Sequence, residues 1–293
     1  RIIATLPLEP DRRRVRPGPG TDQILVEAAT AYCDLVMAVP PADRLSLVPT
    51  PGFPRSELDG QLRALLVDAL RNVAWLPGAD GADIHPARAE WLDLPASERL
   101  TTLLAQSGAF PGLLGPVRSH PALAELGVRR LSAAGLADRL LGVEQPPSWW
   151  WAVYEELGAL VDTVPGLVEE LGGLPVPLVD GRLVPGPATA LLPDSDRLRV
   201  TELSLPGLHV VHPDAAHPLL ARLGARRAHA ADLLDHPAVL EAVERSVEDA
   251  EAGLDPAPLA EAVLELVAHA GPRHWLGALA LPATDGLPTR ADE

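Results

Sequence analysis

Four arginines lie close together near the start of the chain, at positions 12, 13, 14 and 16, in a segment broken by prolines. The chain contains no lysine, so these four side chains supply four of its 24 positive charges in one short segment. A guanidinium group stays protonated and can donate two parallel hydrogen bonds to one phosphate. Two interpretations are open: a basic turn exposed to solvent, or a clamp for an anion such as phosphate.

A second group of polar residues could bind zinc through imidazole and carboxylate ligands, and it comprises His209, His212, Asp214 and His217. Two features argue against that site. His217 belongs to a His-Pro motif whose other copy, at His120, has no such neighbours. His209 and His212 flank an extended Val-Val pair, which directs side chains to opposite faces. We therefore predict no metal site.

The motifs of several common enzyme classes are absent from the sequence. Without lysine there is neither a phosphate-binding Walker loop nor a lysine base. The chain also lacks a Gly-x-Ser-x-Gly nucleophile elbow, a Gly-x-Gly-x-x-Gly fingerprint and a His-Glu-x-x-His zinc motif. We therefore expect no catalytic residues within this chain.

Three consecutive tryptophans, Trp149, Trp150 and Trp151, open a predicted helix that we expect Ser148 to cap. Successive residues of a helix point about 100° apart, so these three rings do not all face one core. We expect one or two of them to pack against a neighbouring element. Contact with a partner protein is the alternative role for the rest.

The elements that position these side chains recur along the sequence. Asp-Gly pairs flanked by apolar residues predict tight hairpin turns, and they occur at Asp80-Gly81, Asp180-Gly181 and Asp285-Gly286. The motif "HPALAELGVRR" at His120 returns as "HPLLARLGARR" at His217. Both patterns have a period of roughly 100 residues, which indicates an internal repeat.

The predicted fold is α+β, rich in helix with short β-hairpins, and contains two to three copies of the repeat. Residues 1–74 form a leading segment, and residues 75–173 form the first repeat unit. Residues 174–293 form the second unit and the truncated hairpin of a third.

Local signals predict several element ends. We expect Thr21 to cap a helix that runs to about Val39, and Ser56 to open the next helix with Asp59 in a capping box. The sequence "LSLVP" between these helices predicts a short strand at residues 45–49. In "HPALAELG", Pro121 suits the first helical position and Gly127 a left-handed C-terminal cap.

Composition narrows the class of protein. A formal net charge of −16 argues against binding to nucleic acid or to an anionic membrane surface. No apolar run approaches the roughly 18 residues of a membrane span. One cysteine, Cys33, excludes an intramolecular disulfide, so we expect a cytoplasmic protein, with a cysteine-poor secreted protein as the alternative. The chain starts without Met, and we expect it to be a piece of a longer protein.

The stretch "ATLPLEPDRRRVRPGPGTDQILVEAATAYCDLV" resembles the segment that follows the ATPase domain in sacsin-like proteins, which are GHKL proteins related to the ninety-kilodalton heat-shock chaperones. Asp11 replaces an asparagine of that family pattern, and Pro7 replaces an alanine. The later stretches "LPVPLVDGRLVPG" and "LPATDG" are similar to the repeat region of the family, with actinobacterial proteins the most similar. The residues that match the first segment are Leu8, Arg12, Arg13, Ala31, Tyr32 and Leu35.

The resemblance implies a function for the arginines. In such proteins an upstream domain binds ATP and Mg²⁺, and an arginine from the following domain lies near the γ-phosphate. Arg12 or Arg13 would be that nucleotide-sensing residue here. The chain would then be the middle region of a chaperone-type ATPase, coupling the ATP state of the upstream domain in cis to contacts with client proteins. The alternative is a non-enzymatic repeat scaffold for protein–protein interaction.

Overall fold

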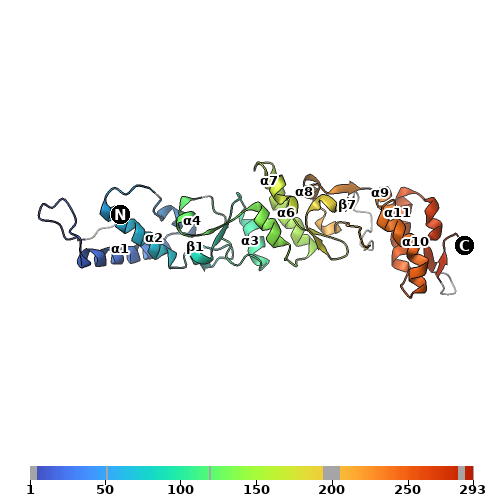
Figure 1. The fold of residues 1–293 in the computed structure, drawn as a ribbon, viewed down its shortest axis with the longest axis horizontal. Helices are drawn as coiled ribbons and strands as arrows, with labels where there is room; N and C mark the ends of the chain where they lie inside the picture. Colours follow the sequence, from blue (N-terminus) through green and yellow to red (C-terminus); the bar gives the residue numbers. More distant parts are fainter. Residues whose placement is uncertain (1–4, 51, 119, 194–204, 283–287, 293) are drawn as a thin grey trace. The chain divides into compact units, whose positions relative to one another are not determined.

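The computed structural model describes residues 5–50, 52–118, 120–193, 205–282 and 288–292 (Figure 1). Its helices and two-stranded sheets form an α+β fold, which confirms the predicted class. The chain divides into two compact units, residues 1–133 and residues 134–293. This division does not test the bounds of the predicted repeat units, which stay a prediction.

The first unit begins with helices. Its helical elements before the first strand are α1 (Pro19–Ala38), the 3₁₀ helix η1 (Pro41–Leu47) and α2 (Glu57–Arg71). The predicted Thr21 cap is wrong, because α1 starts two residues earlier at a proline and the Thr21 hydroxyl donates to the Arg16 carbonyl (2.7 Å) instead. The predicted strand at "LSLVP" is also wrong, since this segment largely belongs to η1, which starts at a proline as helices often do.

The start of α2 follows the sequence prediction in part. The Ser56 hydroxyl accepts a hydrogen bond from the Asp59 amide (3.2 Å), which confirms Ser56 as the N-cap. The Asp59 carboxylate accepts from the Arg55 amide (2.8 Å), one residue before the position that a standard capping box uses. Both bonds satisfy donors that a helix start would otherwise leave unpaired.

Short strands and helices complete the first unit. Strands β1 and β2 form a hairpin in which Leu76 pairs with Ile84, and Gly81 at its turn has φ 85°. Strands β3 and β4 are parallel, with Glu90 opposite Arg129. The bounds are β1 Leu76–Pro77, β2 Asp83–Ile84, η2 Pro86–Arg88, β3 Glu90–Leu92, α3 Glu98–Gln106, α4 Pro121–Glu125 and β4 Arg129–Leu131.

One hydrophobic cluster runs through the first unit from α1 to α4. It includes Val36 of α1, Leu70 of α2, Trp75 before β1 and Leu123 of α4, all essentially inaccessible to solvent. Pro121 begins α4, as predicted, and Gly127, with φ 75°, follows its end in the predicted left-handed conformation. The leading helices and the β1–β2 hairpin therefore share a core and do not form separate lobes.

The second unit contains the Trp-bearing helix α6. Its first elements are α5 Ala133–Leu140, α6 Pro147–Val161, α7 Leu167–Glu170, η3 Leu171–Gly173, β5 Val176–Pro177, β6 Leu183–Val184, η4 Pro187–Thr189 and β7 Leu191–Pro193. The predicted Ser148 cap is wrong, because α6 starts at Pro147 and Pro146 is its N-cap residue. Proline suits a first helical position, where no amide hydrogen bond is lost.

The remaining elements follow the undescribed residues 194–204. They are η6 Pro213–Ala215, α8 Pro218–Arg222, β8 Arg226–Ala228, α9 Ala230–Leu234, α10 Pro237–Glu251, α11 Ala257–Ala270, η7 His274–Ala278, β9 Ala280–Pro282 and β10 Pro288–Arg290. A second hydrophobic cluster joins β7 and β8 to helices α9, α10 and α11.

Among the described residues of the second unit, the strands form two antiparallel pairs and one parallel pair. β5 pairs antiparallel with β6 across Gly181 (φ 80°), and β9 pairs antiparallel with β10. β7 and β8 are parallel, with Leu191 opposite Arg226. The hairpin turns predicted at Asp80-Gly81 and Asp180-Gly181 are therefore confirmed, whereas Asp285-Gly286 lies outside the described residues. Among those residues, no helix has both the length and the apolarity of a membrane span.

Candidate functional site

The arginine cluster lies on a small loop in the first unit. Leu8 and Val15 form an isolated antiparallel bridge, and the Glu9 amide donates to the Arg14 carbonyl (2.9 Å). The Arg16 amide donates to the Pro7 carbonyl (2.8 Å). These bonds close residues 9–16 into a hairpin-like turn, which we call the arginine loop.

Arg12 lies at the turn of the arginine loop with a left-handed backbone. Its φ of 57° is the one positive value at a non-glycine residue in the described part of the chain. The Arg12 amide donates to the Glu9 carbonyl (2.8 Å), and the Asp11 carboxylate accepts from the Arg13 amide (3.0 Å). Side-chain bonding by aspartate of this kind defines an Asx turn, and it offsets the cost of the left-handed residue.

A groove of about 480 Å³ lies between the arginine loop and the first turns of α1 and α2. Arg13 and Arg14 line it, whereas Arg12 does not. Of the two predicted nucleotide-sensing candidates, the fold thus directs Arg13 to this groove, and it adds Arg14, which the sequence had not singled out. The groove is lined by Arg13, Arg14, Val15, Pro17, Thr21, Asp22, Ser56, Glu57, Leu58 and Gln61.

The charges around the groove are mixed. The N-termini of α1 and α2 contribute partial positive charge, and Asp22 and Glu57 lie in their first turns. In the part of the chain that the structure describes, no ion pair involves Arg12, Arg13, Arg14 or Arg16. The guanidinium groups are exposed and available to an incoming anion.

A buried arginine connects the leading helices to the β1–β2 hairpin. Arg44 of η1 is 8% exposed, and its guanidinium donates to the Val39 carbonyl (3.1 Å) and the Trp75 carbonyl (2.8 Å). It also forms an ion pair with Asp83 of β2 (2.7 Å). The sequence had not identified Arg44, because an isolated arginine gives no signal of burial. Arg44 thus connects η1 to the end of α1 and to the β1–β2 hairpin.

The three tryptophans of α6 have different environments. Trp150 is 1% exposed and packs with Tyr154 at a centroid distance of 6.1 Å. Trp149 is half-buried, and its ring meets that of Trp150 edge to face at 5.1 Å. Trp151 is 38% exposed. Burial removes Trp150 from any partner surface in this fold, which leaves Trp149 and Trp151 as candidates.

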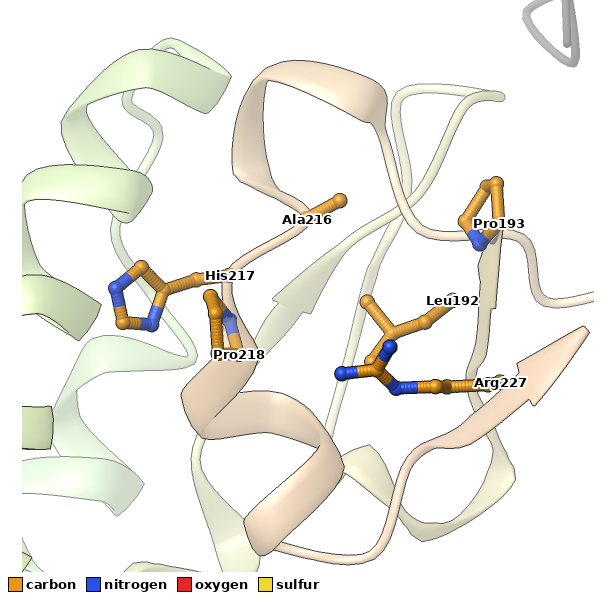
Figure 2. A pocket seen from close by; sticks show the side chains of 6 residues that line it. All are labelled: Leu192, Pro193, Ala216, His217, Pro218 and Arg227. Carbon is orange, nitrogen blue, oxygen red and sulfur yellow. The ribbon is translucent and has the colours of Figure 1, made fainter. Parts of the chain in front are cut away.

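Trp151 lies against a buried histidine. The rings of Trp151 and His217 meet edge to face at 4.7 Å, and His217 Nε2 lies 3.2 Å from Glu155 Oε2. His217 is one of the residues that line a small cavity of about 110 Å³. Figure 2 shows the His217 ring directed away from Arg227 and Leu192. The His217 imidazole therefore packs mainly against α6, through Trp151 and Glu155.

Histidine also has a structural role that the sequence interpretation missed. In five His-Pro dipeptides the imidazole Nδ1 accepts a hydrogen bond from the amide two residues later, at 3.1–3.3 Å. Each histidine is thus the N-cap of a helix or 3₁₀ turn whose first residue is proline. The sequence signal for this capping role was the repeated His-Pro dipeptide, which occurs five times. The capping residues are His85, His120, His212, His217 and His236.

Two members of the hypothetical zinc group, His212 and His217, use Nδ1 in these caps. Over the described residues, no cluster of three or more His, Cys, Asp or Glu side chains could hold a metal ion. A capping nitrogen has its lone pair engaged and is a poor metal ligand.

Comparison with known proteins identifies no relative: no family model, no curated protein and no solved structure matches the chain.

Proposed function

We propose that this chain is the coupling region of a sacsin-like GHKL ATPase of chaperone type, in which the arginine loop contacts the phosphates of ATP bound with Mg²⁺ in an upstream domain. Arg13 and Arg14 are the contact residues, and the chain alone has no catalytic activity. The longer protein works in a bacterial cytoplasm and passes its nucleotide state to bound protein clients.

The observation that carries this proposal is the groove lined by Arg13 and Arg14. Two guanidinium groups on one loop, without ion-pair partners among the described residues, suit the charge and geometry of a phosphate. The groove also adjoins the first turns of α1 and α2, whose partial positive charge favours an anion and acts against the negative charges of Asp22 and Glu57 in the same lining. Stabilising charge on a transferring phosphoryl group is the general role of such arginines.

A route for coupling supports the same proposal. Thr21 fastens the arginine loop to α1 through the Arg16 carbonyl. Arg44 fastens the end of α1 to the β1–β2 hairpin. Because the same hydrophobic cluster extends to α4, a displacement of the loop is transmitted to the rest of the first unit.

ATP turnover by the longer protein tests the proposal. Arg13→Gln and Arg14→Gln should each lower turnover, by roughly 10³-fold if the residue acts as a cis arginine finger. Arg12→Gln is the matched control, because Arg12 is on the same loop and outside the groove lining. If both groove variants bind ATP and turn it over at the wild-type rate, the arginines are solvent-exposed surface charges that do not contact the nucleotide.

A non-enzymatic scaffold is the second candidate, favoured by one observation. Residues 75–131 and 174–228 each contain an antiparallel hairpin followed by a parallel strand pair, and we propose that they are two copies of one repeat, with β9–β10 beginning a third. Repeats of this kind commonly present binding surfaces, and Trp151 is the exposed aromatic candidate. Failure of the longer protein to bind ATP would favour the scaffold.

A further inference from the structure

Among the five His-Pro caps, His236 begins the longest helix, α10, with 15 residues. Its Nδ1 accepts from the Ala238 amide at 3.2 Å. An imidazole accepts at Nδ1 only while that nitrogen carries no proton. The cap therefore requires neutral His236.

The surroundings of His236 oppose its protonation. Arg226 of β8 lies opposite Leu191 of β7, and the Leu191 amide donates to the His209 carbonyl (2.8 Å). Arg226 and His209 thus come from segments on the two sides of β7, and the charges of both act on His236. The neighbouring carboxylate of Asp235 is held by the Arg273 guanidinium at 2.8 and 3.0 Å, so it is already paired with a cation.

Helix α10 in turn holds the last hairpin. Ser246 of α10 is buried, and its hydroxyl accepts from the Ala280 amide of β9 at 2.8 Å. The same hydroxyl donates to carbonyls of Val243 and Ala278, at 2.7 and 3.3 Å. Loosening of α10 would therefore reach β9 and its partner β10.

We propose that His236 is an acid-sensitive cap, whose protonation frees the start of α10 and loosens the β9–β10 hairpin. A proton on Nδ1 removes the acceptor for the Ala238 amide. It also places a positive charge at the positive end of the helix dipole, beside Arg226. The neutral form is thus the one compatible with the folded helix start.

The pH range follows from the direction of the shift. Burial, and then the charges of Arg226 and His209, lower the pKa of the His236 imidazole below its ordinary value of 6.5. A base with a lowered folded-state pKa contributes its full stabilisation above the unfolded pKa and loses it as the pH falls through the folded pKa. Acidification below about pH 6.5 should therefore open α10.

Hydrogen exchange of the full chain at pH 7.5 and pH 5.5, corrected for intrinsic exchange rates, tests this directly. In the wild type, opening of the first turn of α10 and of β9 should increase about tenfold at the lower pH, as expected for a lost cap next to a repelling charge. His236→Asn keeps a capping side chain that does not titrate, and its opening should change less than about twofold. An equal acid response in His236→Asn would overturn the proposal.

Two further measurements keep the proposal testable even if His236→Asn does not fold. His120→Asn alters an equivalent cap in the first unit and should leave the acid response of α10 unchanged. An NMR titration of the wild type should give a His236 pKa below 6.5 that rises in Arg226→Gln; a value at or above 6.5 would contradict the proposal. The pKa of Asp235 is lowered by hydrogen bonds from Arg273, so it titrates below the pH range of the experiment.

Discussion

Residues 75–131 and residues 174–228 each contain an antiparallel hairpin followed by a parallel strand pair, and different side chains stabilise these strands. In the first region Glu90, 2% exposed, lies opposite Arg129, with their charged groups 3.7 Å apart. In the second region the position opposite Arg226 is Leu191, part of a hydrophobic cluster. The parallel strand pair therefore forms around a buried carboxylate in one place and around an aliphatic side chain in the other.

The β1–β2 and β5–β6 hairpins also differ in whether a charged or a neutral side chain stabilises them. The carbonyl before β1, that of Trp75, accepts from the buried guanidinium of Arg44, which also pairs with Asp83. The carbonyl before β5, that of Pro175, accepts from the Tyr154 hydroxyl at 2.6 Å. A charged anchor in the first unit thus corresponds to a neutral anchor in the second. Different side chains can therefore satisfy the backbone carbonyl that precedes a hairpin strand.

The largest expected effect comes from exchanging the central residues of the parallel pairs. Leu191→Glu places a carboxylate in an aliphatic core and should lower the free energy of unfolding by about 3–5 kcal/mol. Urea unfolding followed by circular dichroism measures it. The reciprocal Glu90→Leu should cost less than Leu191→Glu, because it adds no charge to the core and Arg129 stays exposed to solvent. Equal losses in both variants would remove the contrast between a charged centre in one region and an aliphatic centre in the other.

The charged anchor gives the next effect. Arg44→Met leaves the carbonyls of Val39 and Trp75 without their donor, and it should cost about 3 kcal/mol of unfolding free energy. Arg71→Met is the matched control, since Arg71 is exposed and bonds only the Glu125 carbonyl among described residues; it should cost less than about 1 kcal/mol. A loss in Arg44→Met no larger than in the control would show that the anchor contributes little.

The neutral anchor should give the smallest effect. Tyr154→Phe leaves the Pro175 carbonyl without its donor and keeps the ring in place, so we expect a loss of about 1 kcal/mol. Thermal unfolding of the two anchor variants, side by side, measures the difference between them. A loss in Tyr154→Phe that matches Arg44→Met would remove the contrast between charged and neutral anchors.

Local chemistry made part of this fold predictable from sequence. Asp-Gly pairs marked the turns at Gly81 and Gly181, and Ser56 and Gly127 marked helix ends, because each signal acts within a few residues. Proline misled the prediction at Thr21 and Ser148, where it started the helix earlier than the polar cap residue. Residue preferences alone do not decide whether a helix starts at a proline or after a nearby polar cap residue.

Contacts between distant segments could not be predicted in the same way. Arg44 is buried only because Trp75 and Asp83, more than thirty residues later, close over it. The choice of Arg13 and Arg14 over Arg12 depends on where α2 lies relative to the arginine loop. The sequence therefore predicted the cluster of arginines, and only the fold showed which of them line the groove.

We propose above that the arginine loop contacts the phosphates of ATP bound by an upstream domain. The most direct test is hydrogen exchange of the longer protein with and without a non-hydrolysable ATP analogue. We expect slower exchange at residues 11–16 and at the first turn of α2 in the wild type and in Arg12→Gln. We expect no change there in the Arg13→Gln, Arg14→Gln double variant. Bound analogue with unchanged exchange at both segments of the wild type would contradict it.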